Sequence, residues 1–205
     1  MTDGVTTVDL LRHGACEGGE IYRGTTDVPL SDEGRRQMEQ AVTPADGWQR
    51  IVTSPLVRCH DFATAIAADH NLPLSIAHDL REMDFGEWEG RLVSDVWQED
   101  KERVSGFYAN PLESAPPGGE SVAAVAERAV NAWNGLLAAH AGEHLLVVAH
   151  GGIIRVLLAH LLDMPLSSWA RLHIPYAARA RLQIHHNNGE HLPVLVAMTP
   201  LEARA

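Results

Sequence analysis

Short apolar runs alternate with amphipathic stretches along most of the chain. Residues 5–11 (VTTVDLL), 50–54 (RIVTS) and 72–79 (LPLSIAHD) predict strands. Residues 144–149 (HLLVVA) are almost continuously apolar, which is typical of a central strand covered on both faces. Because strands alternate with helical patterns, we expect an α/β fold: a three-layer sandwich with a mainly parallel central sheet flanked by helices.

Helical patterns follow these strands. Residues 31–41 predict a helix capped by Ser31, and residues 54–70 predict another, with Ser54 as its cap and Pro55 at its first position. A third predicted helix begins at Ser121, and a fourth covers residues 153–162. One apolar stripe of the third helix should face the core: Val122, Val125, Ala129, Trp133, Leu136 and Leu137.

Two segments depart from this alternation. Residues 92–119 combine a helical pattern over 92–104 with a loop rich in proline and glycine over 108–120, and we expect a lid or substrate-facing excursion there. Near the C-terminus, residues 180–186 and 191–198 flank the turn sequence NNG and predict an antiparallel hairpin at the sheet edge. The whole chain, 1–205, is expected to form a single domain.

Composition narrows the classes of function. The formal net charge is −11, which opposes nonspecific binding to nucleic acids and to anionic membranes, so we expect neither as a partner. No stretch approaches the roughly 20 apolar residues of a membrane span, and no signal peptide is evident, so we expect a soluble cytoplasmic protein. The two cysteines, Cys16 and Cys59, are too few and too isolated for a disulfide framework or a CxxC motif.

Polar residues suited to anion binding follow several of the apolar runs. Arg12 and His13 end the first run, Arg58 follows the second, and His150 follows the run at 144–149. Glu82 comes after the run at 72–79. Groups at the carboxyl ends of parallel strands converge in one crevice, so we expect these side chains to meet. Each alone would most simply be a structural residue, but together they indicate a functional site.

The ordered motifs LLRHG, YRGTTDVPLSDEG, TSPLVR, LREMDFGEWEG, GGES and VVAHGGIIR resemble those of the histidine phosphatase superfamily, which shares the phosphoglycerate mutase fold. The resemblance implies that His13 is a nucleophile forming a phosphohistidine. It implies that Glu82 is the general acid and base and that His150 stabilises the transferring phosphoryl group. Arg12 and Arg58 would hold the phosphate by bidentate contacts, and Gly14 and Gly151 would let the backbone approach it. No metal or other cofactor is implied.

The sequence departs from many members of this family after the RHG motif. It has Ala15, Cys16 and Gly19 where those relatives carry an acid, a threonine or serine, and a phosphate-binding asparagine. We expect Arg23 or a backbone amide near Gly24 to replace the asparagine. Cys16 suggests a cysteine phosphatase, but the CxxxxxR signature is absent, so we disfavour that interpretation.

The expected substrate is a small phosphorylated molecule. The short, weakly basic interval before HGG favours hydrolysis over mutase activity, and the motifs look most like α-ribazole phosphatases or small broad-specificity phosphatases. The substrate could thus be α-ribazole 5′-phosphate. Mutase-type phosphoryl transfer and a catalytically idle phosphate-binding module remain alternatives, as do a monomer and a homodimer. Four aromatic residues form either an apolar wall for a bulky leaving group or core and lid packing: Trp88, Trp97, Phe107 and Tyr108.

Overall fold

The sheet is the centre of the molecule. The computed structural model describes residues 4–43, 46–187 and 190–199. Its strands are β1 (Val5–Arg12), β2 (Arg50–Thr53), β3 (Leu74–Ile76), β4 (His144–Ala149), β5 (Arg179–Asn187) and β6 (Glu190–Thr199). They form one sheet in the order β3-β2-β4-β1-β5-β6. Strands β1 to β4 are mutually parallel, β5 is antiparallel to β1, and β6 is antiparallel to β5, so the predicted mainly parallel sheet with a C-terminal antiparallel hairpin is confirmed.

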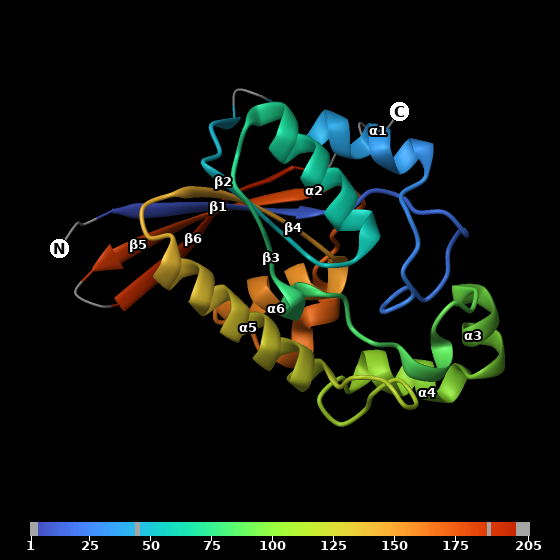
Figure 1. The fold of residues 1–205 in the computed structure, drawn as a ribbon. Helices are drawn as coiled ribbons and strands as arrows, with labels where there is room; N and C mark the ends of the chain where they lie inside the picture. Colours follow the sequence, from blue (N-terminus) through green and yellow to red (C-terminus); the bar gives the residue numbers. More distant parts are fainter. Residues whose placement is uncertain (1–3, 44–45, 188–189, 200–205) are drawn as a thin grey trace.

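Helices cover both faces of this sheet (Figure 1). The helices α1 (Asp32–Ala41) and α2 (Val57–His70) lie on one face, and α5 (Val122–Ala139) and α6 (Gly151–Leu161) lie on the other. Each face has its own apolar core, one including Met38 and Phe62 and the other including Trp133 and Leu157. No helix in the described part of the chain is long and apolar enough to cross a membrane.

Two of the predicted helices form as their sequence patterns indicate. In α1 the Ser31 hydroxyl accepts a hydrogen bond from the Gly34 amide, as expected of a helix cap. The apolar stripe of α5 faces the core through five buried side chains: Val122, Val125, Ala129, Trp133 and Leu137. The sixth predicted residue, Leu136, is half-buried. Both helices are therefore positioned by residues that local pattern alone could identify.

The predicted start of α2 is wrong. The helix begins at Val57 and its cap is Leu56, so Ser54 is not the cap and Pro55 precedes the helix. The Ser54 hydroxyl instead lies 2.6 Å from Nε2 of His150, and it also accepts from the Leu56 amide at 3.3 Å. A side chain that resembled a cap in the sequence is therefore a partner of the second histidine.

The segment between the sheet and α5 also differs from the prediction. The third strand covers only Leu74–Ile76 and leads into the short 3₁₀ turns η2 (His78–Leu80) and η3 (Gly86–Trp88). The single helix expected over 92–104 is two helices, α3 (Val93–Glu99) and α4 (Lys101–Ala109). They separate at Asp100, whose carboxylate accepts hydrogen bonds from Trp88 Nε1 at 2.9 Å and Arg103 Nε at 2.7 Å. These side-chain bonds fix the break between the helices.

The predicted hairpin ends the described chain. Its strands pair over most of their length, with Pro193 opposite Ile184 on the edge strand β6, as a proline in a sheet requires. The predicted NNG turn includes positions 188–189, which lie outside the described residues. Before β5, a 3₁₀ segment, η4 (Leu166–Arg171), leads the chain from α6 back towards the carboxyl end of β1.

Candidate active site

Two histidines lie side by side at the carboxyl ends of the central strands. Arg12 at the end of β1 is in register with Ala149 at the end of β4, so the next residues, His13 and His150, emerge together. The His13 amide donates to the Ala149 carbonyl at 3.0 Å. The two rings are 5.2 Å apart between centroids, and both side chains are buried. Parallel pairing thus brings together two residues far apart in the sequence.

The hydrogen bonds of His13 fix its tautomer. Its Nδ1 lies 2.8 Å from the Gly14 carbonyl oxygen, which can only accept, so Nδ1 carries the proton and donates it. Nε2 therefore keeps a free lone pair. Burial, followed by the charges of Arg12 and Arg58, holds the pKa of His13 well below its ordinary value. The ring is consequently a neutral imidazole at neutral pH.

His150 has the opposite tautomer. The Nε of Arg58 donates to Nδ1 of His150 at 3.3 Å, so Nδ1 is unprotonated and Nε2 carries the hydrogen that is donated to Ser54 Oγ. Burial and then the charge of Arg58 keep the pKa of His150 well below its ordinary value. This histidine is also neutral, and both of its ring nitrogens are engaged, one with Ser54 and the other with Arg58.

The guanidinium of Arg12 is held from two sides. Its Nη1 donates to the Ile174 carbonyl at 2.6 Å, and its Cζ lies 4.2 Å from the ring centroid of Tyr176. Its buried Nε has no hydrogen-bond partner among the described residues. A methyl group on Gly151 would come within 3.2 Å of this Nε, so Gly151 leaves the arginine its space.

Arg58 is fully buried and is oriented by the loop after β1. It donates to the carbonyl of Thr26 at 3.0 Å and to that of Gly24 at 2.7 Å, in addition to His150. The Gly24 amide is itself engaged, because it donates to Glu89 at 3.2 Å. The structure therefore does not leave that amide free for a ligand, contrary to our expectation for Gly24.

Arg23 lies against Gly19, the position at which the sequence lacks the family's asparagine. Its Nη2 donates to the carbonyls of Glu17 at 2.7 Å and Gly19 at 2.8 Å, and its side chain lines the same cavity as His13. Arg23 therefore lines the cavity, and its binding of phosphate stays a prediction. The glycine of the RHG motif has a packing role, since a methyl group on Gly14 would lie 2.1 Å from the backbone oxygen of Gly34 in α1.

Glu82 is buried and lines the same cavity as His13. Its Oε1 accepts from the Met83 amide and its Oε2 from the Gly152 amide, both at 3.0 Å. Gly152 lies in the first turn of α6, and a methyl group there would come within 2.4 Å of Oε1. Two backbone amides and the lack of a side chain at 152 thus fix the orientation of the carboxylate.

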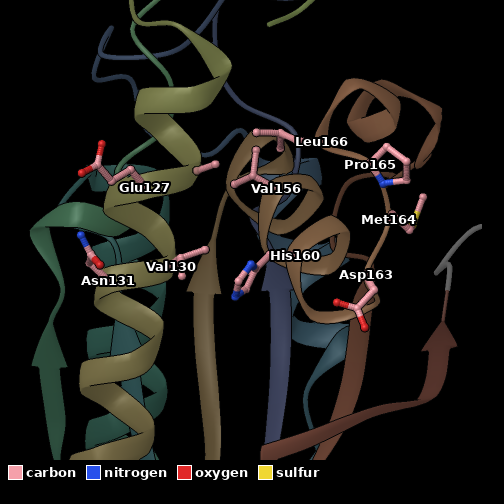
Figure 2. Close-up of a pocket in the computed structure, with 10 residues that line it drawn as sticks. Glu127, Val130, Asn131, Val156, His160, Asp163, Met164, Pro165 and Leu166 are labelled. Atoms are coloured by element: carbon pink, nitrogen blue, oxygen red, sulfur yellow. The ribbon is translucent and has the colours of Figure 1, made fainter.

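Several of these groups line one small cavity of about 160 Å³, whereas Gly14, Gly24, Arg58 and His150 are not among its lining residues. Its lining combines cations and aromatic rings with a single carboxylate: Arg12, His13, Ile21, Tyr22, Arg23, Glu82, Met83, Phe85, Val93, Tyr108, Gly151, Gly152, Arg155, Trp169 and Tyr176. A larger hollow of about 600 Å³ lies between α5 and the end of α6 (Figure 2). None of the predicted site residues lines that hollow, so we place the candidate site at the smaller one.

Comparison with known proteins shows the family of the chain. Residues 8–194 match the histidine phosphatase superfamily (branch 1). The chain belongs to this superfamily. The adenosylcobalamin/alpha-ribazole phosphatase of Escherichia coli is 31% identical over 160 residues, covering 76% of this chain and 79% of the relative. The glucosyl-3-phosphoglycerate phosphatase of Mycolicibacterium vanbaalenii is 34% identical over 184 residues, covering 78% and 76%.

Solved structures of the superfamily share the fold. A mycobacterial glucosyl-3-phosphoglycerate phosphatase in complex with VO3 superimposes with a TM-score of 0.83 at 27% identity, covering 93% of this chain and 97% of the other. An alpha-ribazole phosphatase from Shigella flexneri gives a TM-score of 0.77 at 26% identity, covering 92% and 95%. The three-layer α/β architecture is therefore that of this superfamily.

Some cavity residues were not anticipated from the sequence. Arg155 belongs to the motif VVAHGGIIR, and its spacing along the helix after Gly151 was the available signal. Tyr176 lies in a loop without a distinctive pattern, and only the fold brings it beneath Arg12. Among the four aromatic residues, Trp88 and Phe107 are core residues, whereas Tyr108 lines the cavity and stacks on Trp97.

The cysteines of this superfamily member lie next to its histidines. Cys16 Sγ is 3.5 Å from Nδ1 of His13, and Cys59 Sγ is 3.7 Å from Nε2 of His150. Burial raises the pKa of both thiols, so each is protonated at neutral pH and a poor nucleophile. Within the described residues, no group of three or more histidine, cysteine or acidic side chains is arranged to hold a metal ion.

A second carboxylate organises the loop that holds Arg58. Glu89 accepts hydrogen bonds from the amides of Gly24, Thr25 and Thr26, at 3.0 to 3.2 Å, and from Phe85 at 2.9 Å. Burial alone would raise its pKa, but these hydrogen bonds outweigh burial and lower it. The ionised carboxylate therefore fixes the loop whose carbonyls orient Arg58, and through Arg58 it orients His150.

Proposed function

We propose that this protein is a phosphatase that hydrolyses a phosphate monoester through a phosphohistidine on His13. The observation that supports this most directly is the tautomer of His13, with a free Nε2 lone pair in a cavity lined by arginines. A neutral imidazole is a competent nucleophile towards phosphorus. The arginines offer the donors that a phosphate dianion needs, without a requirement for a metal ion.

In the first step, Nε2 of His13 attacks phosphorus and the bond to the ester oxygen breaks. Arg12 and Arg23, which line the cavity, would offset the charge on the phosphoryl oxygens. Arg58 and His150 would join them by exchanging a present partner for the phosphate: a loop carbonyl in the case of Arg58, and Ser54 in the case of His150. Glu82, in its protonated form, gives its proton to the departing alkoxide. The products of this step are the free alcohol, an ionised Glu82 and a phosphohistidine.

In the second step, the ionised Glu82 takes a proton from a water molecule that attacks the phosphohistidine. The bond between phosphorus and Nε2 breaks, which returns His13 to its neutral state and Glu82 to its protonated state. Inorganic phosphate is released. The Gly14 carbonyl keeps the proton on Nδ1 throughout, so the same nitrogen is available for the next cycle.

The intermediate provides the test. The enzyme would be mixed with p-nitrophenyl phosphate in excess EDTA, quenched in alkali to preserve phosphohistidine, digested and examined by mass spectrometry. We expect one phosphoryl group on the peptide that contains His13. We expect none in His13→Ala, whereas His78→Ala, a change at an exposed histidine outside the cavity, should retain it.

Four results would contradict the proposal. Phosphate release without any labelled peptide would indicate direct attack by water, and label on Cys16 would indicate thiol chemistry. Loss of turnover in EDTA would indicate a required metal ion. No phosphate release from any monoester would leave a phosphate-binding module of the same fold as the better interpretation.

Glu89→Gln tests the positioning of Arg58 and His150. The amide of glutamine cannot accept from all of the loop amides, so the loop should shift and kcat should fall about 10- to 100-fold. Because the arginine remains in the site, KM should change less than kcat. Glu87→Gln, an exposed acid in the same turn, is the matched control and should match wild type. Equal losses in both variants would remove Glu89 from this role.

The relatives name two quite different alcohols. One is α-ribazole, whose 5′-phosphate is one of the substrates that the sequence motifs allow, and the other is glucosylglycerate. Both esters fit the proposed chemistry, because the alcohol leaves with a proton in either case. We therefore propose a small phosphate monoester as the substrate class, with the alcohol recognised by the outer part of the cavity.

A further inference from the structure

Arg155 is a cation in the cavity that the proposed reaction does not use. It lies in α6, about one turn beyond Gly151 and Gly152, and it lines the same cavity as Arg12 and Glu82. Its Nε donates to the Leu172 carbonyl at 2.8 Å, and its Cζ lies 5.7 Å from the ring centroid of Trp169. These contacts hold the guanidinium in place.

The terminal nitrogens of Arg155 remain available. Among the described residues, neither Nη1 nor Nη2 makes a hydrogen bond or an ion pair, although Nε is occupied. Burial lowers the pKa of Arg12, and the nearby charge of Arg155 contributes to the same shift. Two arginines are therefore close enough to repel each other, and an anionic ligand would relieve that repulsion.

The charges of the site leave Arg155 without a counterion. Arg12, Arg23 and Arg155 line the cavity with one carboxylate, Glu82, whereas Arg58 is not among the lining residues and donates to His150. A phosphate monoester contributes close to two negative charges at neutral pH. When Glu82 is protonated, as the first step of the proposed reaction requires, one positive charge of the three lining arginines remains unmatched. A partly buried charge without a partner is unfavourable, which indicates a second anionic group on the ligand.

We propose that Arg155, beside the Trp169 ring, forms a second anion subsite that binds a carboxylate on the alcohol portion of the substrate. A carboxylate fits better than a second phosphate, because only one positive charge is left and the guanidinium fork matches a carboxylate. The cavity of about 160 Å³ requires this carboxylate to lie close to the ester. The substrate class is then the phosphate monoester of a hydroxy acid. This inference rests on the proposed phosphatase function.

A pair of substrates isolates the carboxylate. 3-Phosphoglycerate and glycerol 3-phosphate differ only in carrying a carboxylate or a hydroxymethyl group at the far end. A charge-assisted hydrogen bond contributes about 1.5 to 3 kcal/mol, so wild type should prefer 3-phosphoglycerate by about 10- to 100-fold in kcat/KM. In Arg155→Gln this ratio should approach one, mainly through a higher KM for 3-phosphoglycerate.

Matched variants separate the subsite from general damage. Arg155→Lys keeps the charge but loses the fork, so its ratio should be intermediate. Arg171→Gln removes an exposed arginine from the neighbouring η4 segment, outside the cavity lining, and should leave the ratio as in wild type. Equal use of the two substrates by wild type would overturn the proposal. So would an equal loss on both substrates in Arg155→Gln.

Binding distinguishes failure of the subsite from failure of the proposed function. Both compounds would be titrated by calorimetry into His13→Ala and into His13→Ala combined with Arg155→Gln. Tighter binding of 3-phosphoglycerate in the first variant, lost in the second, would support the subsite even if no phosphate were ever released. Equal binding of the two compounds in the first variant would refute it, whatever the activity of wild type on p-nitrophenyl phosphate.

Discussion

Glu82→Gln is expected to lower kcat for glycerol 3-phosphate about 1000-fold, within the range for loss of a general acid. An alkoxide is a poor leaving group and needs a proton as the ester bond breaks. p-Nitrophenolate is a stable anion and needs little help, so the same variant should lose about 10-fold or less with p-nitrophenyl phosphate. Steady-state kinetics on the two substrates, side by side, measure this difference.

The comparison between substrates is the internal control. Glu82 accepts from the Met83 and Gly152 amides, so glutamine must turn its amide group away from one of them. A purely structural disturbance would reduce both rates by a similar factor. Equal losses on both substrates would therefore assign Glu82 a packing role only, and no loss on glycerol 3-phosphate would exclude it as the acid.

The main features of the fold could be predicted from local pattern, because amphipathic period and strand alternation depend on neighbouring residues. The helix capped by Ser31 and the stripe of α5 are examples. The misread start of α2 has a different cause. Serine is a common helix cap, but the Ser54 hydroxyl forms a hydrogen bond with His150, almost a hundred positions away in the sequence. Nothing local to residues 54–57 could reveal that contact.

The candidate site was predictable to the extent that it depends on strand ends. Arg12, His13 and His150 are placed by parallel pairing, which the sequence pattern anticipates. Whether an amide is free depends instead on tertiary contacts. The sequence suggested the Gly24 amide as a phosphate donor, but this amide donates to Glu89, which is 65 positions away in the sequence. The proposed role of Arg155 likewise depends on the charges of all the cavity residues, which the sequence alone does not bring together.

A buried carboxylate in β1 supports the strand that carries Arg12 and His13. Asp9 has no exposed surface, and its two carboxylate oxygens accept hydrogen bonds from Nε and Nη2 of Arg181, both at 2.8 Å. It also accepts from Trp48 Nε1 at 2.7 Å and from His144 Nε2 at 3.1 Å. Burial alone would raise the pKa of Asp9, but the hydrogen bonds from Arg181, His144 and Trp48 outweigh burial and hold it below its ordinary value. The ion pair therefore depends on an ionised Asp9.

Asp9→Ala is expected to lower the free energy of unfolding by about 3 kcal/mol, because it leaves the indole and the guanidinium without their acceptor. Asp69→Ala, which removes an exposed acid of α2, should change the free energy of unfolding by less than about 0.5 kcal/mol.

Because the folded-state pKa of Asp9 is lowered, the contribution of its charge to stability is complete above the unfolded pKa of 3.8 and declines as the pH falls below that value. Urea denaturation across this range should thus bring wild type and Asp9→Asn closer together at acid pH. A difference that stayed constant, or grew, would mean that packing rather than the charge of Asp9 stabilises the strand.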